Sequence, residues 1–277
     1  MKKRYLSAPL PFPGQKRMFA TQFCKVLKQY PENATFVDMF GGSGLLSHIT
    51  RHEKPDATVI YNDYDNYRAR LENIGRTNTL LSDLRDLVGN SPKHKRLSGQ
   101  KGKEVLERIA LEETTGFVDY ITLSSSLLFS MKYIHNFEEL QKMGLYNNIR
   151  KQDYACDGYL DGLTVTSCNY KARYARYRDT PDTVFLVDPP YLYTEVGTYR
   201  MDWKMTDYLD VLTVLHGNSF IYFTSDKSTI LDLCEWMENH PAVRNPFRNA
   251  GRAEFNARMN YASTYTDIML FNYQDAV

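Results

Sequence analysis

Short apolar runs alternate with polar, helix-compatible segments along most of this chain. The clearest runs are residues 35–40, 57–61 and 183–187, and each is bounded by residues that favour turns. Runs of this length are typical of buried strands, and the segments between them carry apolar residues at helical spacing. The pattern predicts an α/β fold with a doubly wound, mostly parallel sheet and right-handed crossovers.

The remaining elements follow from the same spacing. Helices are predicted over residues 17–27, from 45 onward, and over 64–88, 206–216 and 227–239. Strands are predicted over residues 163–166, 219–224, 254–262 and 264–273. Residues 89–103 have the composition of an exposed loop, and 104–147 are expected to be mostly helical. We therefore expect a catalytic domain formed by residues 1–85 and 163–277, with a helical subdomain inserted at 86–162.

Length and composition are those of a soluble globular protein. The chain has 277 residues, of which 43% are hydrophobic and 24% are charged, and this excludes a mostly disordered chain. It lacks the run of about 18 apolar residues that a membrane span needs. The four cysteines are far apart in the sequence, so we expect reduced thiols in a cytoplasmic protein and no zinc site.

A glycine-rich loop, Gly41-Gly42-Ser43-Gly44, follows the first strand and opens a helix. Such a loop lets the backbone approach a nucleotide-like ligand closely, although a tight turn without a ligand has the same composition. Asp63 ends the next strand, where a carboxylate can accept both hydroxyl hydrogens of a ribose; its alternative role is a helix N-cap. Together the two features favour adenosine binding, in a nicotinamide cofactor or in S-adenosylmethionine.

The segment Asp188-Pro189-Pro190-Tyr191 follows a buried strand. The prolines remove backbone donors and fix the turn, which leaves the Asp188 carboxylate and the Pro189 carbonyl as rigid acceptors. Two acceptors that hold the hydrogens of an exocyclic aromatic amine favour a tetrahedral nitrogen with an exposed lone pair. Tyr191 offers a face on which an extruded base can stack. A proline turn that merely closes a strand is the alternative, but the preceding glycine loop and acidic strand end favour methyl transfer.

In this order the motifs resemble those of the Dam-type DNA adenine methyltransferases, most of all the short bacteriophage members. The resemblance covers residues 9–85 and 163–277, including the last strand. It implies the S-adenosylmethionine-dependent methyltransferase fold and methyl transfer to the N6 amine of a flipped adenine in a specific DNA sequence, with S-adenosylhomocysteine as the product. The matching segments are Phe12-Pro13-Gly14-Gln15-Lys16, Phe36-Val37-Asp38-Met39-Phe40-Gly41-Gly42, Asn62-Asp63 and Val187-Asp188-Pro189-Pro190-Tyr191.

The resemblance also implies roles for individual residues. The cofactor contacts would be Phe12, Lys16, Phe40, Gly41, Gly42, Asp63 and Asp188. The target adenine would be held by Asp188, Pro189, Pro190 and Tyr191. Tyr170 would lie near the adenine of the cofactor, or simply in the core. The family's recognition hairpin is not found between residues 134 and 162, where Asn147-Asn148-Ile149-Arg150 is only an echo of it, so no target sequence is predicted.

The formal net charge of +1 conceals two basic segments without acids, residues 93–103 and 171–178. The first is either a solvated loop or a contact to phosphates. In the second we predict DNA contacts by Lys171, Arg173, Arg176 and Arg178, because this segment precedes the catalytic strand. The partner implied is double-stranded DNA, with a cognate restriction enzyme as a further candidate. We expect a monomer with no membrane partner.

Other functions fit parts of the pattern. A cytosine-N4 or RNA methyltransferase would share the fold, but the aspartate of Asp188-Pro189-Pro190-Tyr191 and the motif order favour adenine in DNA. A nicotinamide-dependent oxidoreductase leaves the segments at Phe12–Lys16 and Asp188 unexplained. A non-catalytic nucleic-acid-binding module has no physical need for an intact catalytic segment.

Overall fold

The structure is a computed structural model that describes residues 3–129, 132–190, 203–240, 243–260 and 263–274. The chain divides into two compact units. Unit 1 comprises Met1–Ser7, Gln15–Asp65 and Gly158–Val277. Unit 2 comprises Ala8–Gly14 and Asn66–Asp157. Each unit has its own hydrophobic core and is described by itself.

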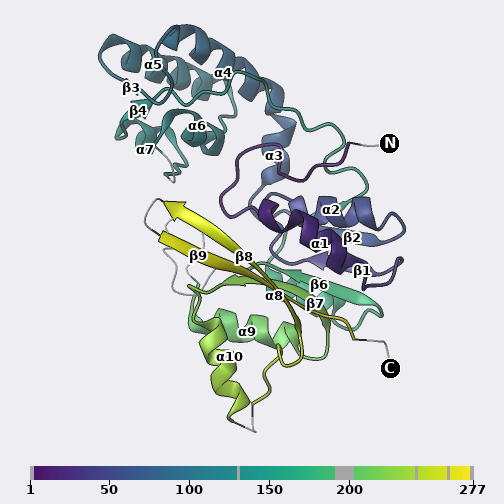
Figure 1. Cartoon of the computed structure of the whole chain (residues 1–277). Coiled ribbons are helices and arrows are strands. Elements are labelled where there is room, and N and C mark those ends of the chain that lie inside the picture. The colour runs from purple at the N-terminus through teal and green to yellow at the C-terminus, as the bar shows by residue number, and fades with distance from the viewer. Residues whose placement is uncertain (1–2, 130–131, 191–202, 241–242, 261–262, 275–277) are drawn as a thin grey trace. The chain divides into compact units, whose positions relative to one another are not determined.

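Unit 1 is built on a seven-stranded sheet with the order β5-β2-β1-β6-β7-β9-β8 (Figure 1). Its strands are β1 (Thr35–Asp38), β2 (Thr58–Asn62), β5 (Thr164–Thr166), β6 (Thr183–Val187), β7 (Ser219–Ser225), β8 (Gly251–Asn260) and β9 (Ser263–Asn272). The first five are parallel, and β9 runs antiparallel to both β7 and β8. This mostly parallel sheet confirms the predicted methyltransferase fold.

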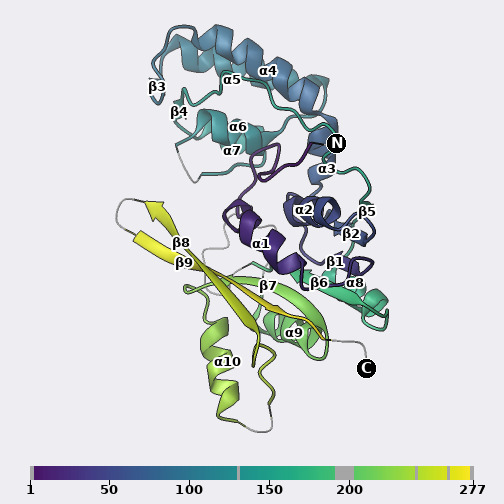
Figure 2. The same ribbon diagram turned by 45° about the vertical axis from the view of Figure 1, so that its right-hand side comes forward.

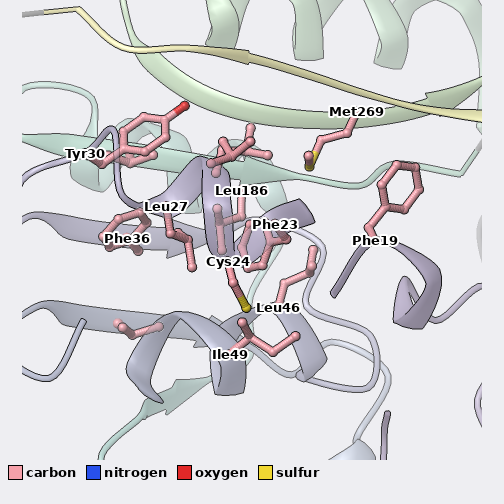
Figure 3. Packing of buried hydrophobic residues seen from close by; sticks show 14 of the residues in the cluster. Phe19, Phe23, Cys24, Leu27, Tyr30, Phe36, Leu46, Ile49, Leu186 and Met269 are labelled. Carbon is pink, nitrogen blue, oxygen red and sulfur yellow. The ribbon is translucent and has the colours of Figure 1, made fainter. Parts of the chain in front are cut away.

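Helices cover both faces of this sheet (Figure 2). The helical elements of unit 1 are η1 (Arg17–Phe19), α1 (Ala20–Leu27), α2 (Leu45–Glu53), α8 (Tyr170–Tyr177), α9 (Met205–Leu215) and α10 (Ile230–Glu238). On one face Phe23 and Leu27 of α1 and Ile49 of α2 pack on Phe36 and Leu186 of the central strands (Figure 3). Helices α8, α9 and α10 bury their apolar side chains in the core of the opposite face. The doubly wound arrangement is therefore confirmed.

The sheet register places the predicted motifs at one edge. Asp38 lies opposite Tyr61 of β2 on one side and Leu186 of β6 on the other. The glycine loop, Asp63 and Asp188 all follow these residues in parallel strands, so they emerge from the same carboxyl edge of the sheet. This edge is where ligands bind in open α/β sheets.

Unit 2 is mainly helical. Its elements are α3 (Tyr67–Glu72), α4 (Ile74–Val88), β3 (Arg96–Leu97), α5 (Gln100–Thr115), α6 (Tyr120–Leu127), α7 (Phe137–Gln141) and β4 (Leu145–Tyr146). Its core is formed by apolar side chains from α4, α5, α6 and α7 together with Leu97 and Leu145 of the antiparallel β3–β4 ribbon. Most of the predicted insertion, residues 86–162, lies in this unit, which also contains α3 and α4.

The amino-terminal segment 8–14 belongs to unit 2 as well. The N–H of Leu10 donates to the Tyr67 hydroxyl over 2.9 Å, and Arg70 donates to the carbonyl of Pro11 over 2.8 Å. Arg70 also forms an ion pair of 3.0 Å with Asp119, whose side chain is 1% exposed. These buried partners fix the segment just before the chain enters unit 1.

Three predicted segments differ from the structure, and one helix was not predicted. The helix predicted over 64–88 is divided at Asn73 into α3 and α4. The predicted loop 89–103 contains β3 and the start of α5, and the region expected to be mostly helical contains β4. Helix α8 lies in the basic segment, where none was predicted. Among the described residues no helix is long and apolar enough to cross a membrane.

Candidate active site

The glycine loop joins β1 to α2 through a tight turn. Gly42 and Gly44 have positive φ angles of 48° and 71°, a conformation that glycine adopts without steric cost. The N–H of Gly44 donates to the carbonyl of Gly41 over 2.7 Å. A Cβ atom at Gly41 would lie 2.4 Å from the ring of Tyr61. Packing against β2 thus requires glycine at position 41, whether or not a ligand approaches the loop.

Tyr61 is a central residue of this edge that the sequence did not indicate. Its side chain is fully buried, and its hydroxyl lies 2.7 Å from the carbonyl oxygen of Gly42 and 3.0 Å from Oδ1 of Asp63. Burial, followed by the neighbouring Asp63 carboxylate, raises the pKa of Tyr61 well above its ordinary value. The phenol therefore stays protonated and links the glycine loop to the predicted ribose carboxylate.

Asn62 connects the ends of three strands. Its Nδ2 donates to the carbonyls of Met39 and Cys168 over 2.9 and 3.0 Å, and its Oδ1 accepts from the N–H of Cys168 over 3.0 Å. The next residue, Asp63, is 6% exposed, and its N–H donates to the carbonyl of Thr166 over 2.7 Å. This network fixes the backbone from which the Asp63 carboxylate projects.

Asp38 is a buried carboxyl group at the end of β1. Its Oδ2 accepts a hydrogen bond of 2.7 Å from Ser47 of α2, while its Oδ1 has no hydrogen-bond partner among the described residues. Burial raises the pKa of Asp38 to about 7; the Ser47 bond opposes this rise and the nearby Asp188 adds to it. Oδ1 is thus an orphaned buried polar atom next to the glycine loop.

Asp188 follows β6 and forms an ion pair with Lys16. The distance between Asp188 Oδ2 and Lys16 Nζ is 2.8 Å, and the two side chains are 17% and 9% exposed. Burial raises the pKa of Asp188, and the Lys16 ammonium opposes that rise. The structure thus pairs Lys16 with an acid of the catalytic segment, and its contact to the cofactor stays a prediction. The pair holds a shielded carboxylate at the edge of the sheet.

The two prolines after Asp188 continue this edge. Pro189 is buried, and the carbonyl of half-buried Pro190 accepts a hydrogen bond of 2.8 Å from the hydroxyl of Tyr208 in α9. Tyr191, predicted to stack on the base, lies outside the described residues. The structure therefore defines the path of the predicted catalytic segment up to Pro190.

Three aromatic rings lie together beside the glycine loop. The ring centroid of Phe40 is 5.3 Å from that of Tyr170 and 5.5 Å from that of Trp203, and Tyr170 stacks on Trp203 at 5.4 Å. The Tyr170 hydroxyl donates to Asp207 over 3.2 Å. Trp203 was not identified from the sequence, because it belongs to none of the motifs. The cluster forms an apolar, π-rich surface, the kind on which heteroaromatic rings pack.

Phe12, the remaining predicted cofactor contact, belongs to unit 2. Its ring meets that of Tyr67 edge-on, with centroids 5.7 Å apart. The structure thus brings Lys16, Phe40, Gly41, Gly42, Asp63 and Asp188 together in unit 1, and the role predicted for Phe12 stays a prediction.

Of the DNA contacts predicted in the basic segment, that of Arg173 needs correction. Arg173 is 2% exposed; its guanidinium lies 3.3 Å from Oδ1 of Asn62 and also contacts Thr166. It therefore supports the ends of β2 and β5 and offers no charge to a phosphate. Lys171 is exposed but forms ion pairs with Asp210 and Asp207 at 2.5 and 3.6 Å. These acids come from α9, a later element that the local sequence does not reveal.

Arg176 and Arg178 lie toward the other edge of the sheet. Helix α8 leaves the carboxyl edge after β5 and returns the chain to the start of β6, so its last turn is at the amino edge. Arg178 pairs with Asp179 at 3.3 Å. Strand β6 separates both arginines from Asp188 at the carboxyl edge, and the DNA contact predicted for them stays a prediction.

Comparisons with known proteins agree with this geometry. The model of the D12 class N6 adenine-specific DNA methyltransferase family matches residues 12–211. A protein of Haemophilus influenzae named "Putative methyltransferase" is 36% identical over 281 residues, which cover 98% of this chain and 94% of that protein. The match to the crystal structure of a precorrin-6y C5,15-methyltransferase from Geobacter metallireducens covers 98% of this chain and 100% of that protein, at 7% identity and with a TM-score of 0.39. The likeness to bacteriophage members stays a prediction.

Proposed function

Because this chain belongs to the D12 class N6 adenine-specific DNA methyltransferases and is a DNA methyltransferase, we propose that it methylates adenine in double-stranded DNA. In this proposal the methyl group comes from S-adenosylmethionine and is transferred to the N6 amine of an adenine that is flipped out of a specific sequence. The observation that carries the proposal is the shielded Asp188 carboxylate paired with Lys16 at the carboxyl edge of β6. It precedes Pro189, whose carbonyl is the second acceptor assigned to the amine. This arrangement suits an exocyclic amine with two hydrogens.

The residues at this edge fit S-adenosylmethionine. Asp63, held on the backbone that Asn62 fixes, would accept the ribose hydroxyl hydrogens. Phe40 presents an aromatic face for an adenine ring. The unpartnered Oδ1 of Asp38 suits a donor on a bound group, because a buried acceptor without a partner costs free energy. When bound, the cofactor supplies an electrophilic methyl group on its sulfonium.

The protein's own part is to hold and align the amine. Asp188 and the Pro189 carbonyl accept its two hydrogens, which directs the nitrogen lone pair away from them. The nitrogen becomes more acidic as it takes the methyl group, and its hydrogen leaves toward Asp188. No covalent enzyme intermediate is needed, and alignment of the reacting atoms alone contributes about 7–11 kcal/mol.

DNA recognition is assigned to unit 2, in keeping with the predicted insertion at 86–162. The cations Lys93, Lys95 and Arg96 are exposed at the β3–β4 ribbon. Phe129 is 64% exposed, and its ring lies 5.7 Å from that of Tyr146 in the same ribbon. Exposed cations beside an exposed aromatic ring suit a phosphate backbone and its bases. A cytoplasmic location fits this substrate and the four free cysteines; the monomeric state and a partner restriction enzyme stay predictions.

One assay tests the proposal. The protein is incubated with tritiated S-adenosylmethionine and separate pools of DNA and RNA, and the modified base is identified by mass spectrometry. We expect N6-methyladenine in duplex DNA, and sequencing of methylated genomic DNA then gives the recognition sequence. N4-methylcytosine or label in RNA alone would replace the proposed substrate, and absence of label from every pool would overturn the proposal.

A further inference from the structure

We propose that Tyr208 is a positioning residue that holds the carbonyl of Pro190 and so fixes the backbone of the catalytic segment Asp188-Pro189-Pro190. The inference rests on the proposed function. Tyr208 lies in the first turn of α9, is 3% exposed, and donates its hydroxyl hydrogen to the carbonyl of Pro190 over 2.8 Å. The bond connects α9 to the segment that follows β6.

The backbone of Pro190 explains why one hydrogen bond matters here. The proline ring fixes φ of residue 190, so ψ is its only soft dihedral. The carbonyl of Pro190 shares a rigid plane with the nitrogen and Cα of residue 191. A donor that holds this carbonyl therefore fixes ψ of Pro190 and, with it, the end of the catalytic segment. Neither proline has an N–H, so only carbonyl oxygens can tie this backbone, and that of Pro189 is assigned to the amine.

Tyr208 is itself held in place from several directions. The neighbouring Asp207 accepts hydrogen bonds from the N–H of Lys204 over 3.0 Å and from the Tyr170 hydroxyl over 3.2 Å. The ring of Trp203 meets that of Tyr208 edge-on, with centroids 5.1 Å apart. The start of α9 is thus fixed to the aromatic cluster by Asp207 and to the catalytic segment by Tyr208. A rigid donor of this kind can impose an orientation on its acceptor.

Tyr30 is a matched control for the structural cost of removing the hydroxyl of Tyr208. Tyr30 is also 3% exposed and also donates to a backbone carbonyl, that of Phe220, over 2.8 Å. Phe220 lies near the start of β7, at the amino edge of the sheet and away from Asp188. Tyr208→Phe and Tyr30→Phe each remove a buried phenol–carbonyl bond and keep the ring, so both have a structural cost of this kind. Tyr30→Phe also removes a longer contact of 3.3 Å to the carbonyl of Asn272.

The experiment compares both variants with the wild-type protein. Thermal unfolding and the Kd for S-adenosylmethionine verify folding, and kcat is measured on duplex DNA that carries the sequence found by methylome sequencing. We expect Tyr208→Phe to lower kcat about 10-fold with the KM for S-adenosylmethionine unchanged, and Tyr30→Phe to keep wild-type kcat. A duplex with 2-aminopurine at the target position reports base stacking, and its fluorescence in the complex should change only with Tyr208→Phe.

The outcomes separate the two proposals. Equal kcat and equal 2-aminopurine fluorescence in Tyr208→Phe and Tyr30→Phe, with an active wild-type protein, would overturn the inference alone. A wild-type protein that leaves no methyladenine in DNA would overturn the proposed function and the inference with it. A fall in kcat that appears only together with weaker cofactor binding would assign Tyr208 to the cofactor site instead.

Discussion

The two units present the charged side chains of their proposed sites in opposite ways. In unit 1 the acids Asp38, Asp63 and Asp188 are shielded at one edge of the sheet. In unit 2 the cations Lys93, Lys95 and Arg96 stand exposed at a short ribbon. Shielding suits groups that must meet reacting atoms at fixed positions, since a low local dielectric strengthens each contact. Exposure suits contact with phosphates, which are recognised mainly by charge. Catalysis and DNA binding should therefore respond to different substitutions.

The largest effect is expected from Asp188→Ala. Loss of the carboxylate removes an acceptor of the amine and the partner of Lys16, so methyl transfer should fall about 10³-fold or more. Binding of S-adenosylmethionine, measured by isothermal titration calorimetry, should largely persist. Asp232→Ala, at an exposed position of α10, should leave both unchanged. Loss of cofactor binding alone would move Asp188 from the reaction to the cofactor.

In unit 1, Gly41→Ala should weaken the binding of S-adenosylmethionine and destabilise the protein, whereas the matched substitution in unit 2 should do neither. The new Cβ would meet the Tyr61 ring at 2.4 Å and the Asn62 carbonyl at 2.8 Å, so the link from the glycine loop to Asp63 would shift. We expect a free energy of unfolding lower by about 1–3 kcal/mol and a Kd for S-adenosylmethionine raised about 10-fold or more. Urea unfolding and calorimetry measure the two.

The control for this substitution lies in unit 2. A Cβ at Gly75, within α4, would meet nothing within 4 Å, so Gly75→Ala should stabilise the protein by about 0.5–1 kcal/mol without change in cofactor affinity. Equal effects of the two substitutions would contradict the packing argument for Gly41.

The sequence predicted unit 1 better than unit 2. Strands β1 and β6 are contiguous apolar runs between turn residues, and their order alone places Asp38 and Asp188 at one edge. Strands β3 and β4 have two residues each and pair across a long stretch of chain, so no local pattern marks them.

Within the site, the sequence indicated the residues of the motifs, but not the side chains on other elements that hold these motifs in place. Tyr61 and Tyr208 act through bonds to residues on other elements, Gly42 and Pro190, and their own neighbours in sequence give no sign of this. Arg173 belongs to a run of cations that is typical of a DNA-binding surface, but it is buried against Asn62. Which side chains of α8 are exposed depends on which face of the helix packs on the sheet. The many cations of this segment made the apolar face of the helix hard to recognise in the sequence.

Substitution of the exposed cations of unit 2 should affect DNA binding alone. In Lys93→Gln/Lys95→Gln/Arg96→Gln, the affinity for duplex DNA should fall about 10-fold at physiological salt. The slope of log affinity against log salt should decrease by about 0.9 for each phosphate that the variant no longer neutralises. Arg176→Gln/Arg178→Gln, at the amino edge of the sheet, should change neither quantity. Fluorescence anisotropy at several salt concentrations measures the affinity and its dependence on salt. If only Arg176→Gln/Arg178→Gln weakened DNA binding, the DNA contact would belong to α8 and not to the β3–β4 ribbon.

The smallest effect is expected in the pH profile of Lys16→Gln. Burial raises the pKa of Asp188 and Lys16 opposes the rise, so loss of the ammonium should raise this pKa further. Since the ionised carboxylate is the form that accepts the amine hydrogen, the acid limb of kcat should move to higher pH, by about one pH unit or less. Measurement at saturating S-adenosylmethionine keeps any loss of cofactor affinity out of kcat. Arg17→Gln, the exposed neighbour in η1, should leave the limb in place, and a limb that moves to lower pH would refute the ion-pair argument.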